Sequence, residues 1–258
     1  MLRQIPNLFT LINLVFGCLA ILFVLQVDES LAYTEAGDLF LRLPEYMVYG
    51  SLCIVGAAIV DFLDGFIARW LNAASEMGKQ LDSLCDAVSF GVAPSLIAYQ
   101  LLKLSYLKST KALDTSMIVL IPALLIACCA VWRLAKFNID QRQSVSFRGV
   151  PTPITAMVFA SLPMILWFDA GVYSEVLLNP WFLYGLILVT SFLMVSDFPI
   201  MSMKLSGGSF KNYLPQLIFL IVSIILMLFL KWAAVPAIYI VYVLLSLLFR
   251  NQILSNKS

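Results

Sequence analysis

The sequence predicts an all-α membrane protein, a polytopic bundle of about eight transmembrane helices in one domain. Composition is the first reason: 62% of the 258 residues are hydrophobic and 12% are charged, whereas a soluble domain is about 25% charged. The mean hydropathy of +0.95 agrees with this. The hydrophobic residues also gather into separate runs of about 20, the length that spans the hydrocarbon core of a bilayer.

These runs place helices at eight positions along the chain. We expect spans at residues 5–27, 46–71, 80–102, 116–138, 151–169, 180–200, 214–231 and 233–249. No small-residue cleavage pattern follows the first run, so we expect a retained helix rather than a signal peptide. The connections are too short to fold by themselves, and residues 1–258 are therefore expected to form a single membrane domain.

Composition also limits the function. The net charge of +1 and the absence of a basic block argue against a nucleic-acid partner. The cysteines all fall inside apolar segments, without metal-ligand spacing, which predicts reduced core residues. The chain has no histidine, so acid–base or metal chemistry must use carboxylates.

The distribution of lysine and arginine predicts the orientation in the membrane. With the amino terminus in the cytoplasm, 11 of the 16 basic residues fall on the inner side and five on the outer side. Cytoplasmic loops carry the excess of positive charge in membrane proteins. We therefore expect both termini in the cytoplasm, although three lysines in the loop 103–111 count against this orientation.

One segment, DFLDGFIARWLNAASEMGKQLDSLCD at residues 61–86, carries four aspartates next to an apolar run. A carboxylate inside a membrane helix costs about 2.5–3.5 kcal/mol on insertion scales and is a functional hypothesis by default. Asp61 and Asp64 are three residues apart, and Asp82 and Asp86 are four apart, so each pair shares one helix face. A bend over residues 72–78 would fold the two helices antiparallel and turn the pairs toward each other.

Four carboxylates this close require cations. Oxygen ligands without histidine or thiolate favour Mg²⁺ or Mn²⁺, and Mg²⁺ usually completes its shell with substrate phosphates. The pattern therefore indicates a phosphate-bearing substrate. A lone membrane aspartate would more simply indicate an ion or proton pathway, so the inference rests on the joint spacing.

Small residues and an arginine accompany the aspartates. Gly65, Ala68 and Gly78 would leave room for a ligand, and Arg69 could bind a phosphate with two hydrogen bonds. Taken alone, the small residues would more simply be helix-packing positions, and Arg69 a membrane-boundary anchor. Together with the aspartates they describe a diphosphate pocket.

The segment resembles the full signature of the CDP-alcohol phosphatidyltransferases. It reads Asp61-x2-Asp64-Gly65-x2-Ala68-Arg69-x8-Gly78-x3-Asp82-x3-Asp86, with no departure at the eight fixed positions. The resemblance implies a membrane enzyme that transfers a phosphatidyl group from a CDP-linked lipid to a small alcohol and releases CMP. It also implies two divalent metal ions, a homodimer, a family core at about residues 1–200 and two further transmembrane helices at about 214–249.

The resemblance assigns roles to individual positions. It implies a metal site formed by Asp61, Asp64, Asp82 and Asp86. In this site Asp86 is also the general base on the acceptor hydroxyl. It implies contacts with the CDP group at Gly65, Ala68, Arg69 and Gly78. Asn7 and Thr10, at the start of the first span, are further candidates for the nucleotide, although helix capping explains either residue equally well.

The choice of acceptor rests on three flanking stretches, IPNLFTLINLVFGCLAI, RLAKFN and FRGVPTP. They look like the phosphatidylserine synthase branch of the family, which implies CDP-diacylglycerol and L-serine as substrates. Arg133 and Arg148 are candidates for the serine carboxylate or a nearby phosphate, and Asn138 for a polar contact. The basic residues could equally bind lipid phosphates, and glycerol 3-phosphate or inositol stay open as acceptors.

Two other classes of protein are alternatives to this hypothesis. An ion-coupled transporter would also carry membrane carboxylates, but it predicts broken helices or a repeat between the two halves, and the sequence indicates neither. A structural subunit that merely binds metal is the other class. We expect an integral protein of the bacterial inner (cytoplasmic) membrane.

Overall fold

The computed structural model describes most of the helical chain. The described residues are 5–26, 31–33, 39–41, 45–71, 75–107, 116–139, 149–198, 200–201 and 214–249. The helices and strands in order are α1 (Ile5–Leu25), β1 (Leu31–Tyr33), β2 (Leu39–Leu41), α2 (Glu45–Trp70), α3 (Glu76–Asp86), the π-helical turn η2 (Ala87–Val92), α4 (Ala93–Leu107), the 3₁₀ turns η4 (Met117–Val119) and η5 (Ile121–Leu124), α5 (Leu125–Ile139), α6 (Thr152–Phe168), α7 (Ala170–Leu177), α8 (Pro180–Val195), α9 (Leu214–Leu230), the 3₁₀ turn η8 (Lys231–Ala233) and α10 (Ala234–Leu248).

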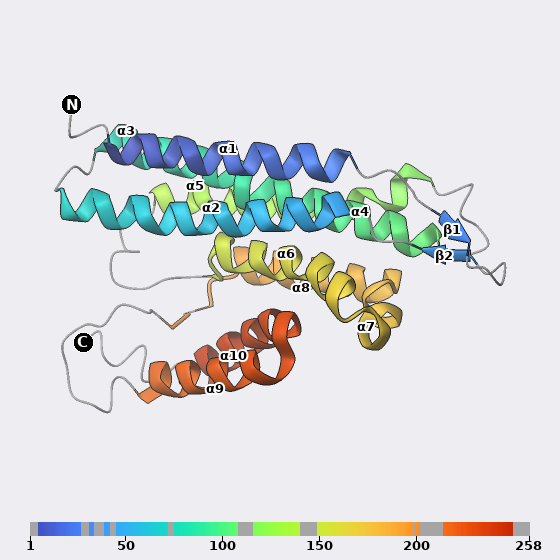
Figure 1. The fold of residues 1–258 in the computed structure, drawn as a ribbon. Helices are drawn as coiled ribbons and strands as arrows, with labels where there is room; N and C mark the ends of the chain where they lie inside the picture. The colour runs from blue at the N-terminus through green and yellow to red at the C-terminus, as the bar shows by residue number, and fades with distance from the viewer. Residues whose placement is uncertain are drawn as a thin grey trace.

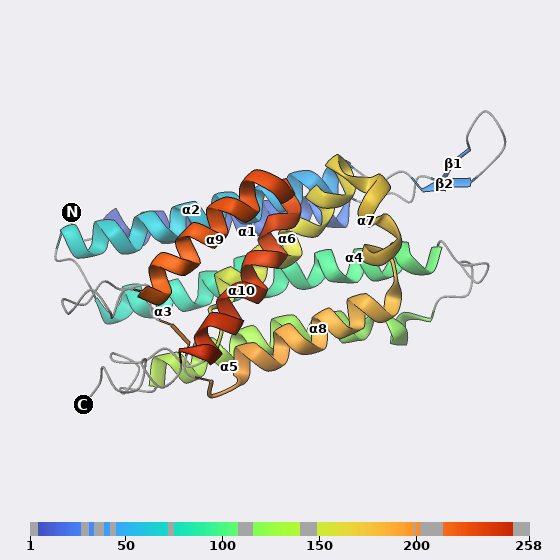
Figure 2. The same ribbon diagram turned by 90° about the horizontal axis from the view of Figure 1, so that it is seen from below.

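The long helices form an antiparallel bundle, as predicted. α1 and α2 lie side by side above α6, and the α9–α10 pair forms a further layer on the other side of α6 (Figure 1). Seen from below, α4, α5 and α8 lie beside one another, and α9 and α10 cross the bundle obliquely (Figure 2). The strands β1 and β2 pair antiparallel in a short ribbon at one end of the bundle, an element that the sequence did not predict.

Five helical segments of the described chain are apolar and long enough to cross a membrane. They are Pro6–Leu25, Glu45–Trp70, Glu76–Leu107, Met117–Ile139 and Leu214–Leu248. Two apolar helices, α6 and α8, are shorter, at 17 and 16 residues. Many large apolar side chains face outward, which is expected of a surface in contact with lipid rather than water. The protein is an integral membrane protein.

The last of these segments is folded back on itself. Lys231 has φ +48°, an unusual value for a residue other than glycine, and it separates α9 from α10. The two helices then pack against each other. Their bounds lie close to the expected ranges 214–231 and 233–249.

The third span differs from the expected range 80–102. It runs from Glu76 to Leu107 as α3, η2 and α4 without a break. The start of α3 could not be predicted from hydropathy, because its first turns are polar. Hydropathy indicates burial in the membrane and not helix formation. The expected bend over residues 72–78 is correspondingly shorter, and Gly78 lies inside the first turns of α3.

Close helix contacts hold this span against α1. A Cβ added at Gly17 would collide with Ser89 on η2, including its backbone Cα at 2.8 Å. The Ser89 hydroxyl also donates to the backbone carbonyl of Asn13, at 3.1 Å. Only glycine allows this approach, and the contact aligns the polar face of α1 with the carboxylates of α3.

Candidate active site

Three of the four signature aspartates converge where α2 ends and α3 begins. Asp61 and Asp64 lie on α2 and Asp82 on α3, and their carboxylate oxygens lie within 4.8 Å of one another. Asp64 is 7% exposed, while Asp61 and Asp82 are half-buried. Asp82 Oδ1 is buried without a hydrogen-bond partner among the described residues. Oxygen-only donors at this separation fit a hard divalent cation, which would also satisfy that oxygen.

Asp86 lies one helical turn further along α3, directly before the π-helical turn η2. It is 8% exposed and interacts electrostatically with Asp61 and Asp82. Its Oδ1 accepts a hydrogen bond from the side-chain amide of Asn13, at 3.1 Å. π-Helical turns inside α-helices are frequent at functional sites, because they change which side chains face the site. Asp86 is thus held at the inner end of the carboxylate cluster.

Helix α1 lines the site with a polar stripe on an otherwise apolar helix. Asn7, Thr10 and Asn13 recur every three residues and therefore share one face. The Thr10 hydroxyl lies 3.0 Å from Asp64 Oδ2 and 3.1 Å from the Pro6 carbonyl oxygen. A hydroxyl has one proton, and a carboxylate is the stronger acceptor, so the bond to Asp64 is favoured.

A cavity of about 230 Å³ opens beside the carboxylates. Its lining comprises Pro6, Asn7, Thr10, Asp64, Gly65, Ala68, Ser75, Gly78, Lys79 and Asp82. We call it the donor-side cavity. Every residue predicted to contact CDP lines this cavity except Arg69. Arg69 is exposed on α2 and is not part of the lining.

The two glycines of the donor-side cavity differ in what surrounds them. A Cβ added at Gly65 would meet no atom within 4 Å and would project into open space. At Gly78 the added Cβ would lie 3.0 Å from Asn7 Oδ1 and 3.1 Å from Ser75 Oγ. Gly78 N–H in turn donates to Ser75 Oγ, at 3.0 Å, which caps the start of α3. Gly65 thus leaves room for a ligand, while Gly78 allows α1 to approach α3.

A second cavity, of about 160 Å³, lies further along the same face of α3, where α3 meets α5 and the start of α6. Its lining comprises Lys79, Asp82, Ser83, Asp86, Arg133, Leu134, Phe137, Asn138, Thr152 and Pro153. We call it the acceptor-side cavity. Lys79 and Asp82 border both cavities, so the two meet at one wall of α3.

Arg133 and Asn138 from α5 both line the acceptor-side cavity. Arg133 is 8% exposed, and its Nε has no hydrogen-bond partner among the described residues. The Asn138 side-chain Nδ2 donates to Ser83 Oγ at 2.8 Å, and Lys79 Nζ donates to the backbone carbonyl of Asn138 at 3.5 Å. The third predicted acceptor residue, Arg148, lies outside the described residues. A buried guanidinium with spare donors is suited to binding an anion.

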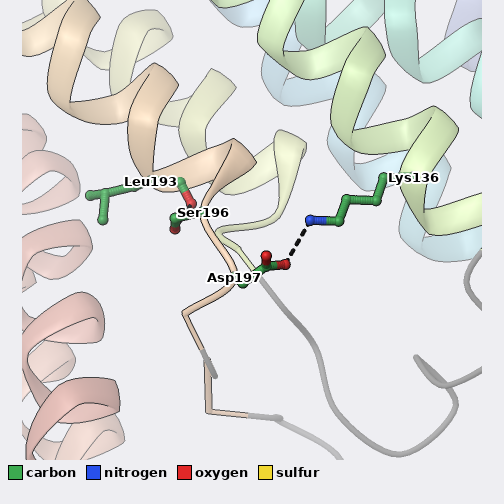
Figure 3. Close-up of polar contacts among 4 residues, drawn as sticks. All are labelled: Lys136, Leu193, Ser196 and Asp197. Atoms are coloured by element: carbon green, nitrogen blue, oxygen red, sulfur yellow. Dashed lines mark hydrogen bonds and ion pairs between the residues drawn. The ribbon is translucent and has the colours of Figure 1, made fainter.

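The end of α8 and the residues just after it contact the two helices that supply this cavity. Lys136 on α5 forms an ion pair with Asp197, with Nζ and Oδ1 2.6 Å apart (Figure 3). Before α6, Val150 N–H donates to the Leu193 carbonyl at 3.1 Å. The adjacent Gly149 has φ +73°, and a Cβ there would collide with the Met194 carbonyl, so this position requires glycine.

Several residues around the site were not predicted for it. They are Asn13, Lys79, Ser83 and Thr152. Only Asn13 had a usable signal, the three-residue spacing of polar side chains on α1. The others depend on how α3, α5 and α6 meet, which local sequence does not encode.

Comparison with known proteins agrees with this geometry. The family model described as CDP-alcohol phosphatidyltransferase matches residues 3–192. A CDP-diacylglycerol–serine O-phosphatidyltransferase of Bacillus subtilis (strain 168) is 35% identical over 161 residues, which are 62% of this chain and 76% of that protein. A protein of the same name from Mycobacterium leprae (strain TN) is 32% identical over 210 residues, 78% of this chain and 59% of that protein.

An archaeal relative has a related name. The archaetidylserine synthase of Methanothermobacter thermautotrophicus is 30% identical over 175 residues, 66% of this chain and 60% of that protein. The matched part thus spans about three fifths of the mycobacterial and archaeal proteins. The matched residues 3–192 include all four aspartates and every residue that lines the two cavities. This chain belongs to the CDP-alcohol phosphatidyltransferase family and is an enzyme.

Proposed function

We propose that this enzyme transfers the phosphatidyl group of CDP-diacylglycerol to the hydroxyl of L-serine, giving phosphatidylserine and CMP. The observation that carries the proposal is the pair of cavities that meet at Lys79 and Asp82, one beside the carboxylate cluster and one containing the buried Arg133. Such an arrangement brings two substrates to the same carboxylates, one from the side of α1 and α2 and the other from the side of α5 and α6. The names of the bacterial relatives support serine as the acceptor.

Two divalent ions, Mg²⁺ or Mn²⁺, would be held by the four signature aspartates, Asp61, Asp64, Asp82 and Asp86. The buried, unpartnered Asp82 Oδ1 and the oxygen-only donor set support this assignment. When bound, the ions would neutralise the diphosphate and the charge that develops on the leaving CMP.

The donor-side cavity would bind the CDP group. Gly65 and Ala68 leave space for it, and Asn7 and Thr10 offer polar contacts from α1. Gly78 keeps α1 and α3 close together at the cavity wall. Arg69, which is exposed, would meet phosphates of the lipid or the nucleotide from outside this lining.

Asp86 would act as the general base. The serine oxygen forms a bond to the lipid-side phosphorus, the bond from that phosphorus to the oxygen of CMP breaks, and the serine hydroxyl proton moves to the Asp86 carboxylate. Asn13 would hold that carboxylate in place through its hydrogen bond to Oδ1. The base must be a carboxylate or another non-imidazole group, because the chain has no histidine.

The acceptor would lie in the second cavity. Arg133 would pair with the serine carboxylate, Asn138 would add a polar contact, and Arg148 is a further candidate for the same anion. Glycerol 3-phosphate and inositol are the alternative acceptors for the same chemistry. Arg133 and Lys79 are the cationic side chains among the described residues lining this cavity, and the names of the bacterial relatives favour serine over these alternatives.

We also propose that α1, α2, the continuous α3–η2–α4 segment, α5, α6, α8, α9 and α10 make eight membrane crossings within one domain. Both termini would lie in the cytoplasm, and the enzyme would be a homodimer in the bacterial inner membrane. The excess of lysine and arginine on the expected inner side supports this orientation. The carboxylate cluster would then open toward the cytoplasm, where CMP is released.

An acceptor screen tests the proposed function. Purified full-length protein in mixed micelles receives CDP-diacylglycerol, Mg²⁺ or Mn²⁺, and labelled L-serine, glycerol 3-phosphate or inositol in separate reactions. We expect labelled lipid and equimolar CMP with serine alone. Product with another alcohol and none with serine would refute the serine assignment, and no turnover with any alcohol would refute the transferase chemistry.

A further inference from the structure

Buried hydroxyl groups continue from the acceptor-side cavity along α6. Thr152 lines the cavity, and Thr155 follows one helical turn later on the same face. Both residues are fully buried, and neither Oγ1 has a hydrogen-bond partner in the described part of the chain. An unpaired buried hydroxyl costs about 1–3 kcal/mol, so two in succession indicate a place where a polar ligand binds.

Tyr239 on α10 continues this row from a different helix. Its side chain is 5% exposed, and its hydroxyl lies next to that of Thr155 without forming a hydrogen bond of acceptable geometry. One turn further along α10, Tyr242 interacts electrostatically with Arg133. The face of α10 that carries both tyrosines therefore lies beside Thr155 and Arg133, directly behind the described lining of the acceptor-side cavity.

Hydrogen bonds to one residue fix the position of α10. The Tyr242 hydroxyl donates to the Met201 carbonyl at 3.0 Å, and Met201 N–H donates to Ser246 Oγ at 3.2 Å. Tyr239 packs in the same apolar cluster as Val150 and Val158 of the α6 region. The Tyr239 hydroxyl is thus held in a defined place, as a binding group requires.

We propose that the α9–α10 hairpin completes the acceptor site, with the Tyr239 hydroxyl acting beside Thr152 and Thr155 as a specificity-determining group for a small zwitterionic alcohol. This inference rests on the proposed function, because it assigns the acceptor to the same cavity. Hydroxyl oxygens accept hydrogen bonds from an ammonium group, while the Arg133 guanidinium pairs with a carboxylate. The family match ends at residue 192, so α10 would add a selective contact from outside the matched residues.

Steady-state kinetics of Tyr239→Phe test the inference, because this change removes only the hydroxyl. In the full-length protein we expect the KM for L-serine to rise about five- to twentyfold, with the KM for CDP-diacylglycerol and the melting temperature nearly unchanged. Thr155→Val should give the same selective rise. Tyr184→Phe is the matched control: it removes a hydroxyl that donates to the Val119 carbonyl at 2.6 Å, away from both cavities, and should leave the serine KM unchanged.

The outcomes separate this inference from the proposed function. An unchanged serine KM in Tyr239→Phe and Thr155→Val, with a wild type active on serine, would overturn the inference alone. An equal rise in both KM values would assign Tyr239 to packing and also overturn it. If the wild type uses only another alcohol, the serine assignment fails, and an unchanged KM of both variants for that alcohol would overturn the inference as well.

Discussion

The side-chain amide of Asn13 on α1 donates a hydrogen bond to Asp86 Oδ1 on α3, at 3.1 Å. Asn13 is fully buried and Asp86 is 8% exposed, so water does not compete strongly for the bond. An amide N–H can only donate, so this bond holds one carboxylate oxygen of Asp86 in its charged, accepting form. The orientation of the proposed base is therefore set by a helix that the signature motif does not include.

Asn13→Ala should lower kcat about 10- to 100-fold, because a hydrogen bond to a charged group is worth about 1.5–3 kcal/mol. The KM for either substrate should change little, since Asn13 lines neither cavity among the described contacts. Asn179→Ala is the control: Asn179 caps α8 by accepting from Trp181 N–H at 2.9 Å, so its loss should reduce thermal stability alone. An unchanged kcat in Asn13→Ala would show that Asn13 does not position the base.

Asp86→Asn should reduce turnover by about 10²–10⁴-fold, the usual contribution of a general base, while CDP-lipid binding is retained. Single-turnover assays and binding of a labelled CDP-lipid measure the two effects separately. Asp169→Asn, which removes a carboxylate 3.9 Å from Lys231, is the control. Near-normal activity of Asp86→Asn would refute the base assignment.

Removal of divalent metal should abolish turnover, and Mg²⁺ or Mn²⁺ should restore it. Metal alone should also raise the melting temperature of the chelator-treated protein, because a ligand at 100 times its Kd stabilises by about 2.7 kcal/mol. Asp82→Asn should weaken this thermal shift, since Asp82 belongs to the carboxylate cluster. A metal-dependent shift of equal size in Asp82→Asn would exclude this residue as a ligand.

Gly65→Ala should raise the KM for CDP-diacylglycerol about tenfold without lowering the melting temperature. The added methyl group would project into the donor-side cavity and would meet no protein atom within 4 Å. Gly185→Ala on α8 likewise meets no atom within 4 Å but is absent from the lining of either cavity, so it should leave the KM unchanged. If both variants have the wild-type KM, the space at Gly65 does not bind the donor.

Arg133→Ala should raise the KM for serine about 10- to 100-fold and that for the lipid much less, because a buried guanidinium pairs with the acceptor carboxylate in the proposed site. Lys136→Ala is a control on the same helix. Its ion pair with Asp197 is between side chains that are 38% and 63% exposed, so its loss should cost less than about 1 kcal/mol. Equal KM changes for both substrates in Arg133→Ala would indicate a phosphate or folding role.

The aspartate cluster could be predicted because it depends on short-range geometry. Spacings of three and four residues place Asp61 with Asp64, and Asp82 with Asp86, on common helix faces, and α2 and α3 follow each other closely in the sequence. Asn7 and Thr10, predicted only as polar residues at the start of the first span, both line the donor-side cavity. The apolar runs likewise predicted the helical bundle, since only helices satisfy the backbone hydrogen bonds of such segments in lipid.

The remaining features depend on packing between distant segments. Nothing local to Asn13 indicates that it meets Asp86 rather than Asp82, because the pairing follows from the close approach of Gly17 to Ser89. The π-helical turn after Asp86 has no compositional signal. Tyr239 is separated by more than 80 residues from Thr155, and only the folded α9–α10 hairpin brings their hydroxyls together.

The shared wall formed by Lys79 and Asp82 has a kinetic consequence. One substrate can occupy each cavity without displacing the other, because the first cavity is otherwise lined by α1 and α2 and the second by α5 and the start of α6. The phosphatidyl group can then pass directly from donor to acceptor in a ternary complex, with no lipid attached covalently to the enzyme between steps. Initial velocities measured at several concentrations of both substrates should accordingly give intersecting double-reciprocal lines, whereas parallel lines are the mark of a ping-pong enzyme.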